Sequence, residues 1–560
     1  CSLRGGPRYS RVAGRAGYGL RDCRHFCSRP AGLIWSCVAG FETDIVADCL
    51  FRFRVKTVST VAISRNDQVT LDRLKEMRTY GGARVTRGLT DEVILDFLAE
   101  NADLAVAIER GYDSFLELKE THPDLLALDE NEQIVQTLQR IKNFYPTDAV
   151  NPYVAVAAAG PWIVTLKGAV VYDCGGYGML GFGHAPPTVL DAMNQPHAMA
   201  NVMTPNISQY DFVERLSEEI GHTRPDGFPF ARFIFMNSGS EAMTVASRIA
   251  DVNTRKLTDP GGRYEGRKIC GLTLVGSFHG RTDRPAHFSD SSRANYEKHL
   301  ATFREGQYLL TVAPNDVESL EATFAQADAD GVFIEAFFME PVMGEGNPGL
   351  AIEPAFYKRA RELTREHGAM LVVDSIQAGL RARGLLSITD YPGFRELDAP
   401  DMESYSKALN AGQYPLSVLA LSDFCANTYR RGLYGNTMTA NPRAMDIGIA
   451  VLDLLSDELR ENIRARGRDL VTKLGALAGD TDGAVTGAQG TGLLLSCELD
   501  KRYKIYGSDS TEDYLRRIGL AVIHGGKHSL RYTPVFNITA KEVDLIVSLT
   551  RQALIAGPTH

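Results

Sequence analysis

An aspartate and a lysine follow neighbouring apolar runs of the sequence, and together these two residue types can do chemistry. Asp374 directly follows AMLVV (369–373), and Lys407 lies in a polar turn between DMESYS and LSVLAL. A carboxylate at the carboxyl end of a buried strand faces the crevice where open α/β sheets bind ligands. The alternatives are that Asp374 caps the following turn and that Lys407 is a solvated surface charge. Pyridoxal phosphate requires both groups, an amine for its Schiff base and a carboxylate for its pyridinium nitrogen.

A turn rich in serine and glycine supplies an expected phosphate site. ARFIFMN (231–237) has the pattern of a strand, and a helical pattern follows it. Ser238, Gly239 and Ser240 therefore lie at the amino end of the predicted helix, where backbone N–H groups and the helix dipole favour an anion. The alternative is an ordinary serine N-cap with Glu241 in the first turn. An N-cap alone does not explain why this turn occurs together with the aspartate and the lysine.

These motifs give the sequence a resemblance to the class III (ornithine/acetylornithine-type) aminotransferases, which are pyridoxal phosphate enzymes of fold type I. The matching stretches, in the family's order, are MNSGSEA (236–242), SFHGRT (277–282), MEPVMGEG (339–346), VVDSIQAGLRARG (372–384), SYSKAL (404–409) and NTMTANP (436–442). The resemblance covers the chain from about Asn151 to the C-terminus. The sequence departs from the family's usual Glu at Ser375, its Gln at Met343, and its Gly-Gly pair at Thr439 and Ala440. These departures concern the substrate rather than the reaction.

The resemblance implies roles for residues that bind the cofactor. Ser238, Gly239 and Ser240 are expected to hold its phosphate. The other implied roles are Lys407 for the Schiff base, Asp374 for the ring nitrogen, Phe278 for stacking on the ring, Gln377 beside the ring hydroxyl, and Thr437 for the partner subunit's phosphate across a homodimer interface.

The resemblance also implies residues that bind the substrate. Arg281 matches the arginine that grips a substrate α-carboxylate, a task that suits a planar guanidinium. Glu345 and Arg531 match a gate pair, and Tyr177 matches an aromatic residue that shapes the substrate pocket. The alternatives are that Arg281 forms a salt bridge within the domain and that Tyr177 is a packing residue in a Gly-rich turn.

The implied reaction is a ping-pong transamination. It moves an amino group from an L-ω-amino acid of ornithine, acetylornithine, lysine or 4-aminobutyrate type to a 2-oxo acid, with 2-oxoglutarate as the expected acceptor. The alternatives are another fold type I enzyme, either a racemase or mutase or a decarboxylase, and a homologue without catalytic activity.

Composition narrows the remaining possibilities. The net charge of −9 gives no reason to expect binding to nucleic acid or membranes. No apolar run reaches the roughly 18 residues that a membrane span requires. The nine Cys show neither a zinc spacing nor a disulfide framework.

The first thirty residues carry seven Arg against one acid, Asp22. That bias favours a mitochondrial or plastid transit peptide, whereas the alternative is a mispredicted N-terminus without a role.

The order of patterns predicts an α/β fold with five segments. Residues 1–75 are expected to be a disordered transit segment, and 76–145 a helical extension that packs on the core or on a partner subunit. Residues 215–455 alternate apolar runs with helical patterns, which predicts a large domain with a mostly parallel sheet. Residues 146–214 and 456–560 are expected to form the two parts of a split α+β small domain.

Overall fold

The computed structural model describes residues 67–175, 177–198, 202–304 and 308–559. They belong to one compact unit, Ile63–His560, and the second unit, Cys1–Ala62, lies outside them. The Arg-rich part of the expected transit segment therefore lies outside the described residues. Within the described residues, no helix is both long enough and apolar enough to cross a membrane.

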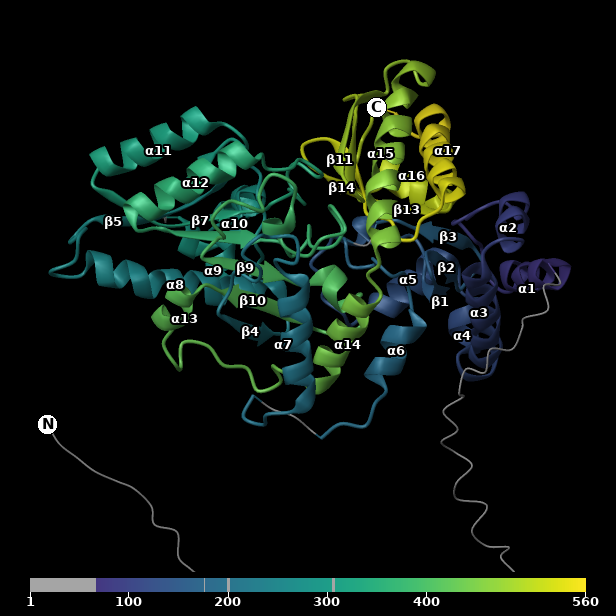
Figure 1. The fold of residues 1–560 in the computed structure, drawn as a ribbon. Coiled ribbons are helices and arrows are strands. Elements are labelled where there is room, and N and C mark those ends of the chain that lie inside the picture. Colours follow the sequence, from purple (N-terminus) through teal and green to yellow (C-terminus); the bar gives the residue numbers. More distant parts are fainter. Residues whose placement is uncertain (1–66, 176, 199–201, 305–307, 560) are drawn as a thin grey trace, which may run out of the picture. The chain divides into compact units, whose positions relative to one another are not determined.

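A seven-stranded sheet forms the core of the predicted large domain (Figure 1). Its strand order is β4-β10-β9-β8-β7-β5-β6; β10 runs antiparallel to both of its neighbours, and the other adjacent pairs are parallel. The strands are β4 (Arg232–Met236), β5 (Lys268–Leu274), β6 (Tyr308–Val312), β7 (Val332–Met339), β8 (Met370–Asp374), β9 (Met402–Tyr405) and β10 (Ser417–Leu421). The predicted mostly parallel sheet is confirmed, whereas the direction of β10 was not predicted.

Helices cover both faces of this sheet, which explains the near-continuous apolar runs in its central strands. Figure 1 shows α11 and α12 on one side of the sheet and α8 and α13 on the other. α8 contacts β4, β7, β8, β9 and β10, and α11 and α12 also contact β7. The helices of this region are α7 (Ile207–Glu219), α8 (Gly239–Thr258), α9 (Asp283–Ala286), α10 (Arg293–His299), α11 (Val317–Ala329), α12 (Pro354–His367), α13 (Asp423–Thr428) and α14 (Pro442–Asp453).

Two four-stranded sheets lie outside the large sheet. One has the order β1-β2-β3-β13, and the other has the order β11-β12-β15-β14. β3 pairs with β13 in parallel, so segments from both ends of the described chain share one sheet. The elements are β1 (Ala155–Ala159), β2 (Trp162–Thr165), β3 (Val170–Asp173), α6 (Pro187–Met193), α15 (Asp457–Asp480), β11 (Val485–Thr491), β12 (Leu494–Leu499), α16 (Thr511–Ile518), β13 (Leu520–Ala521), β14 (Ile523–Gly525), β15 (Ser529–Tyr532) and α17 (Ala540–Ala556).

The helical extension packs on the first of these small sheets. Its helices are α1 (Asp67–Thr79), α2 (Asp91–Leu98), α3 (Ala102–Thr121), α4 (Pro123–Ala127) and α5 (Glu130–Leu138). α1 begins before the predicted boundary at residue 76, so the expectation of disorder to residue 75 was wrong for 67–75. α3 contacts β1 and β2 so closely that a Cβ at Gly111 would lie 2.7 Å from Cγ1 of Val164. The extension thus packs on the core of its own chain, a choice that the sequence left open.

Lys167, in the turn between β2 and β3, fastens the extension to this sheet. Its side chain is buried, and Nζ donates to the carbonyls of Gly82 (3.0 Å), Leu126 (3.1 Å) and Tyr80 (3.4 Å). These carbonyls belong to loops and a helix of the extension. One buried ammonium therefore satisfies three carbonyl acceptors that are buried or partly buried.

Replacing Lys167 by Met should lower the free energy of unfolding by about 1–3 kcal/mol, because buried carbonyls lose their donor. The midpoint of chemical denaturation, followed by circular dichroism, measures the loss. Lys541→Met is the matched control, since Lys541 joins α17 to the extension only through partly exposed contacts, including ion pairs with Asp96 and Glu100. Such pairs contribute about 0–1 kcal/mol each. Equal midpoints for the two variants would contradict the role given to Lys167.

Candidate active site

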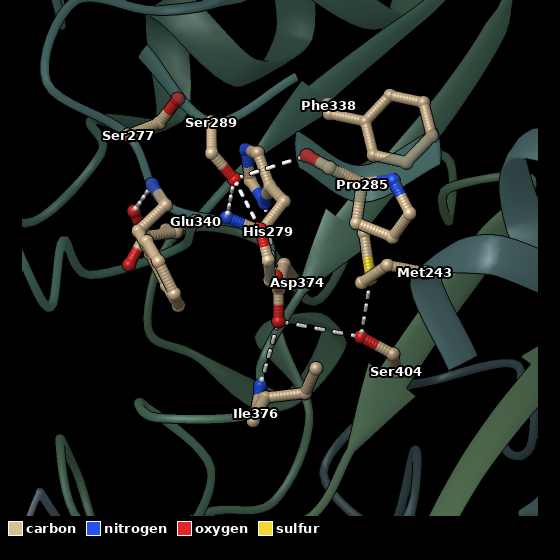
Figure 2. Close-up of polar contacts among 12 residues, drawn as sticks. Met243, Ser277, His279, Pro285, Ser289, Phe338, Glu340, Asp374, Ile376 and Ser404 are labelled. Atoms are coloured by element: carbon tan, nitrogen blue, oxygen red, sulfur yellow. Dashed lines mark hydrogen bonds and ion pairs between the residues drawn. The ribbon is translucent and has the colours of Figure 1, made fainter. Parts of the chain in front are cut away.

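Asp374 is the last residue of β8, and only 5% of its surface is exposed. Its Oδ2 lies 2.9 Å from Nδ1 of His279 (Figure 2). Its Oδ1 accepts hydrogen bonds from the backbone N–H of Ile376 (3.1 Å) and from the hydroxyl of Ser404 (3.4 Å). The bond from Ile376 is the turn cap that the sequence offered as the alternative, and the same carboxylate also lines the cavity described below. Asp374 therefore both caps the turn and lines the cavity.

His279 is the partner of Asp374 that the sequence did not predict, although it lies inside SFHGRT. Its side chain is fully buried, and its Nε2 lies 3.1 Å from Oγ1 of Thr273. That hydroxyl donates to the carbonyl of Phe338 (3.1 Å), so its oxygen accepts from Nε2–H. Nδ1 faces the carboxylate of Asp374, so each ring nitrogen of His279 has an oxygen partner.

Glu340 is a second buried acid that the sequence did not predict, although it lies in MEPVMGEG. Its Oε1 accepts from the backbone N–H of Phe278 (3.0 Å), and its Oε2 accepts from that of Gly344 (2.7 Å). Burial raises the pKa of Glu340 to about 7, against the lowering effect of the nearby His279 charge. Glu340 thereby joins the loop of the predicted stacking residue to the loop that contains Glu345.

Lys407 begins the 3-10 turn η5 (Lys407–Asn410) with a φ of +49°, a left-handed conformation that is uncommon for a side chain of this size. Its Nζ donates to Oε1 of Gln377 (3.2 Å). Burial, and then the charge of Arg531, lower the pKa of Lys407 to about 8. The other amide atom of Gln377, Nε2, is buried and has no hydrogen-bond partner in the described part of the chain. Lys407 is therefore no solvated surface charge.

The amino end of α8 lines the same cavity as Asp374 and Lys407. Ser238 caps the helix, as the alternative proposed, and Oε2 of Glu241 accepts the N–H groups of Asn237 (2.8 Å) and Ser238 (3.0 Å). These bonds leave the N–H groups of Gly239 and Ser240 without a protein acceptor among the described residues. Two free donors at a helix amino end suit an anion such as a phosphate.

One cavity gathers all but one of the predicted cofactor residues. It is lined by Ser238, Gly239, Ser240, Phe278, Asp374, Gln377 and Lys407, together with His279 and Glu340. Thr437 is exposed and does not line it; its carbonyl accepts from the N–H of Val202 (3.3 Å). The cavity thus combines anion donors, a carboxylate and an amine of lowered pKa. These groups fit a phosphorylated pyridine aldehyde.

Three of the predicted substrate residues form one cluster beside this cavity. Arg531, on β15, is 1% exposed, and its Nη1 donates to Oε2 of Glu345 (3.2 Å) and to the carbonyl of Gly344. Its Cζ lies 5.5 Å from the ring centroid of Tyr177. The predicted gate pair is therefore in contact, and Tyr177 packs against its arginine.

Arg281 lies apart from that cluster, on the exposed side of the site. Its Cζ is 5.1 Å from the ring centroid of Phe278, a distance typical of a cation–π contact. The alternative for Arg281 was a salt bridge within the domain, and no ion pair of Arg281 occurs among the residues that the structure describes. Its guanidinium remains accessible to a carboxylate from solution.

Comparison with known proteins identifies similar chains. A family model described as aminotransferase class-III matches residues 144–554. An acetylornithine aminotransferase of Neisseria meningitidis serogroup B is 28% identical over 410 residues, which cover 72% of this chain and 95% of that protein. An ornithine aminotransferase of Staphylococcus carnosus is 28% identical over 399 residues, covering 70% and 92%. A solved ornithine aminotransferase of Toxoplasma gondii, described with partial occupancy of PLP at its active site, shares the fold with a TM-score of 0.65 and 24% identity, covering 78% and 97%.

The lowered pKa of Lys407 predicts reactivity at moderate pH. In the cofactor-free protein, modification of Lys407 by trinitrobenzenesulfonate should rise with pH about a midpoint near 8, because the neutral amine is the nucleophile. Peptide mapping of samples quenched at each pH measures this midpoint. Exposed lysines ordinarily titrate near about 10.4, and Arg531→Leu should move the Lys407 midpoint upward. A Lys407 midpoint at the ordinary value would show that the cavity does not disfavour the ammonium form.

Proposed function

The chain belongs to the class III aminotransferase family, and from this premise we propose that it moves an amino group from an L-ω-amino acid to a 2-oxo acid. The donor is of ornithine, acetylornithine, lysine or 4-aminobutyrate type, and the acceptor is 2-oxoglutarate. The names of the relatives support this donor class. The observation that carries the proposal is the amine of Lys407, which lines one cavity with Asp374 and the amino end of α8.

Enzymes of this family use pyridoxal 5′-phosphate, and the cavity residues fit it. The free N–H groups of Gly239 and Ser240 would hold the phosphate, and Asp374 would hold the protonated ring nitrogen. Phe278 would pack on the ring, and the unpartnered amide of Gln377 would face its hydroxyl. Thr437 would contact the cofactor phosphate of a partner subunit. When bound, the cofactor supplies an electron sink for the substrate carbon that loses its proton.

Lys407 and Asp374 carry the catalytic roles in this proposal. Lys407 would hold the cofactor covalently and, once released by the substrate amine, would move the proton between the substrate and the cofactor. A pKa of about 8 suits this task, because an amine with a pKa near the working pH both accepts and returns a proton. The donors around Asp374 would hold its carboxyl group in place to pair with the protonated ring nitrogen.

The substrate side would work as a gate. Arg281 would hold the α-carboxylate of either substrate through its planar fork. Arg531 would pair with Glu345 while the donor is bound and would turn to the second carboxylate of 2-oxoglutarate. The exchange would spare a buried guanidinium from being left unpaired, which costs about 3–5 kcal/mol when a buried pair is broken.

We also propose that the enzyme is a homodimer. Apolar side chains beside the loop of Thr437 are exposed, with Met203 at 85%, Ile207 at 74% and Val202 at 56%. Such a patch is typical of an interface, and sedimentation velocity tests it.

The division into a large domain and a split small domain is likewise our proposal, supported by the pairing of β3 with β13. We further propose that the Arg-rich N-terminal segment directs the protein to an organelle. The location of a fluorescent fusion protein in cells tests this.

Turnover with the four candidate donors and 2-oxoglutarate tests the function. At least one donor should yield glutamate, and Lys407→Ala should lower the rate by about 10³-fold or more while the cofactor still binds noncovalently, because the proton-transfer group is lost. Lys473→Ala, on the outer helix α15, is the control and should keep wild-type turnover. Stereochemical inversion or release of carbon dioxide without glutamate would favour a racemase, mutase or decarboxylase. Absence of a cofactor absorption band would favour a homologue without catalytic activity.

Separate measurement of the two half-reactions tests the gate. Glu345→Ala should leave Arg531 free, so glutamate turnover should rise about tenfold relative to the ω-amino donor, the equivalent of about 1.4 kcal/mol. Arg281→Lys should instead weaken both half-reactions, because a point charge does not replace the fork. Glu498→Ala, at an exposed position of β12, is the matched control for a lost carboxylate. An unchanged ratio in Glu345→Ala would refute the gate and remove the main support for the donor class.

A further inference from the structure

Glu403 is a buried acid near the cavity that the proposed function does not use. It lies on β9, and 0% of its surface is exposed. Its Oε1 accepts from the hydroxyl of Ser375 (2.6 Å) and from the N–H of Ile388 (2.9 Å), and its Oε2 accepts from the hydroxyl of Ser387 (2.6 Å). One carboxyl group thus joins β9 to the turn after β8 and to the residues that open the 3-10 turn η4 (Ile388–Asp390).

Glu403 makes no ion pair in the described part of the chain. Two other buried acids of this domain do have an arginine partner: Asp401 lies 2.7 Å from Arg361, and Glu335 lies 3.1 Å from Arg284. A buried acid that only neutral donors satisfy is costly to keep. Filling space in the core, which an apolar side chain does at less cost, therefore does not explain Glu403.

The pairing of β8 with β9 places Glu403 and Ser375 behind Asp374. The two strands are parallel, with Val373 opposite Glu403 and Asp374 opposite Ser404. The N–H of Ser375 continues the pairing by donating to the carbonyl of Ser404 (3.0 Å). Successive side chains of a strand point to opposite faces. Asp374 and Ser404 therefore meet on the cavity face (Figure 2), whereas the side chains that follow and precede them in the chain meet on the other face.

Ser375 is also a position at which the sequence departs from the family, which usually has Glu there. A glutamate at this position would place its carboxyl group one bond beyond the site of the serine hydroxyl, where the carboxyl group of Glu403 now lies. The chain thus has a carboxyl group behind Asp374 that comes from β9 instead of from the turn after β8.

We propose that Glu403 is a positioning residue for Asp374 and supplies, from β9, the carboxyl group that Ser375 lacks. The proposal rests on the proposed function, in which Asp374 binds the ring nitrogen of the cofactor. Glu403 touches neither cofactor nor substrate. It fixes Ser375, so the turn after β8 does not rotate the adjacent carboxyl group of Asp374 away from the ring nitrogen.

The hydrogen bonds of Glu403, rather than its charge, carry this role. Burial raises the pKa of Glu403 to about 7, against the lowering effect of the hydrogen bond from Ser375. In its protonated form the group still offers an oxygen to Ser375 and Ile388 and a hydroxyl to Ser387. A glutamine offers an oxygen and an N–H in the same places, so Glu403→Gln should preserve the position of Asp374, whereas Glu403→Ser should not.

Binding of two cofactor analogues to the full chain tests this without turnover. Pyridoxamine 5′-phosphate has the ring nitrogen, and its 1-deaza analogue has a carbon in that place, so the ratio of their dissociation constants reports the contact with Asp374. Glu403→Ser should lower the preference for the nitrogen compound about tenfold, whereas Glu403→Gln and the exchange variant Ser375→Glu/Glu403→Ser should keep it within about twofold. Glu335→Ser is the matched control, since it removes another buried acid of the same sheet, and it should keep the wild-type ratio.

Equal weakening of both analogues in Glu403→Ser would show a general structural loss and overturn the proposal. A reduced preference in Glu403→Gln would overturn it as well. If circular dichroism showed that Glu403→Ser does not fold, the exchange variant would decide: the wild-type ratio supports the proposal, and a reduced ratio or an unfolded chain overturns it. A wild type without preference for the ring nitrogen would refute the role of Asp374 in the proposed function and this proposal with it, so the two failures are distinguishable.

Discussion

The buried carboxyl group of Asp374 is the polar group that the large sheet must accommodate. A buried charge is costly unless it is paired and hydrogen-bonded. Its partners come from separate places: the imidazole of His279 from the loop after β5, the hydroxyl of Ser404 from β9, and the N–H of Ile376 from the turn that follows β8. β9, β8, β7 and β5 are neighbours in the sheet, and all adjacent pairs among them are parallel. Their carboxyl ends therefore meet at one edge, and only that topology brings these donors to one oxygen pair.

A second buried carboxylate joins the cofactor side to the substrate side. Glu340 follows β7 directly, and its two oxygens accept from Phe278 and Gly344. The carbonyl of Gly344 in turn accepts from Arg531, which belongs to a strand of the other sheet. A shift of the small sheet is thus transmitted through Gly344 and Glu340 to the loop of the ring-stacking residue. These hydrogen bonds form a continuous path of polar contacts between the two parts.

The sequence predicted the parts of the site that depend on local pattern. Asp374 and Lys407 follow apolar runs, and a strand–turn–helix pattern marks the amino end of α8, so each was predictable from its neighbours. His279 and Glu340 lay inside quoted motifs, but their partners are far away in sequence, and only the strand order brings them together. The antiparallel β10 was not predictable, since strand direction depends on how the chain returns to the sheet. Glu403 lies in DMESYS, but its hydrogen-bond partners Ser375 and Ser387 come from other segments.

The charges around Lys407 link the two ends of the site. Burial and the guanidinium of Arg531 lower the pKa of its amine, whereas the carboxylates of Asp374, Glu345 and Glu340 raise it, and the balance lies at about 8. Under the proposed gate, a dicarboxylic acceptor on Arg531 brings a carboxylate that neutralises the guanidinium, as Glu345 does while a monocarboxylic donor is bound. Arg531 would then be paired with a carboxylate in both half-reactions, although the two substrates differ by one carboxylate. Under the proposed gate, one lysine would serve both substrates because the arginine that distinguishes them would be neutralised in either state.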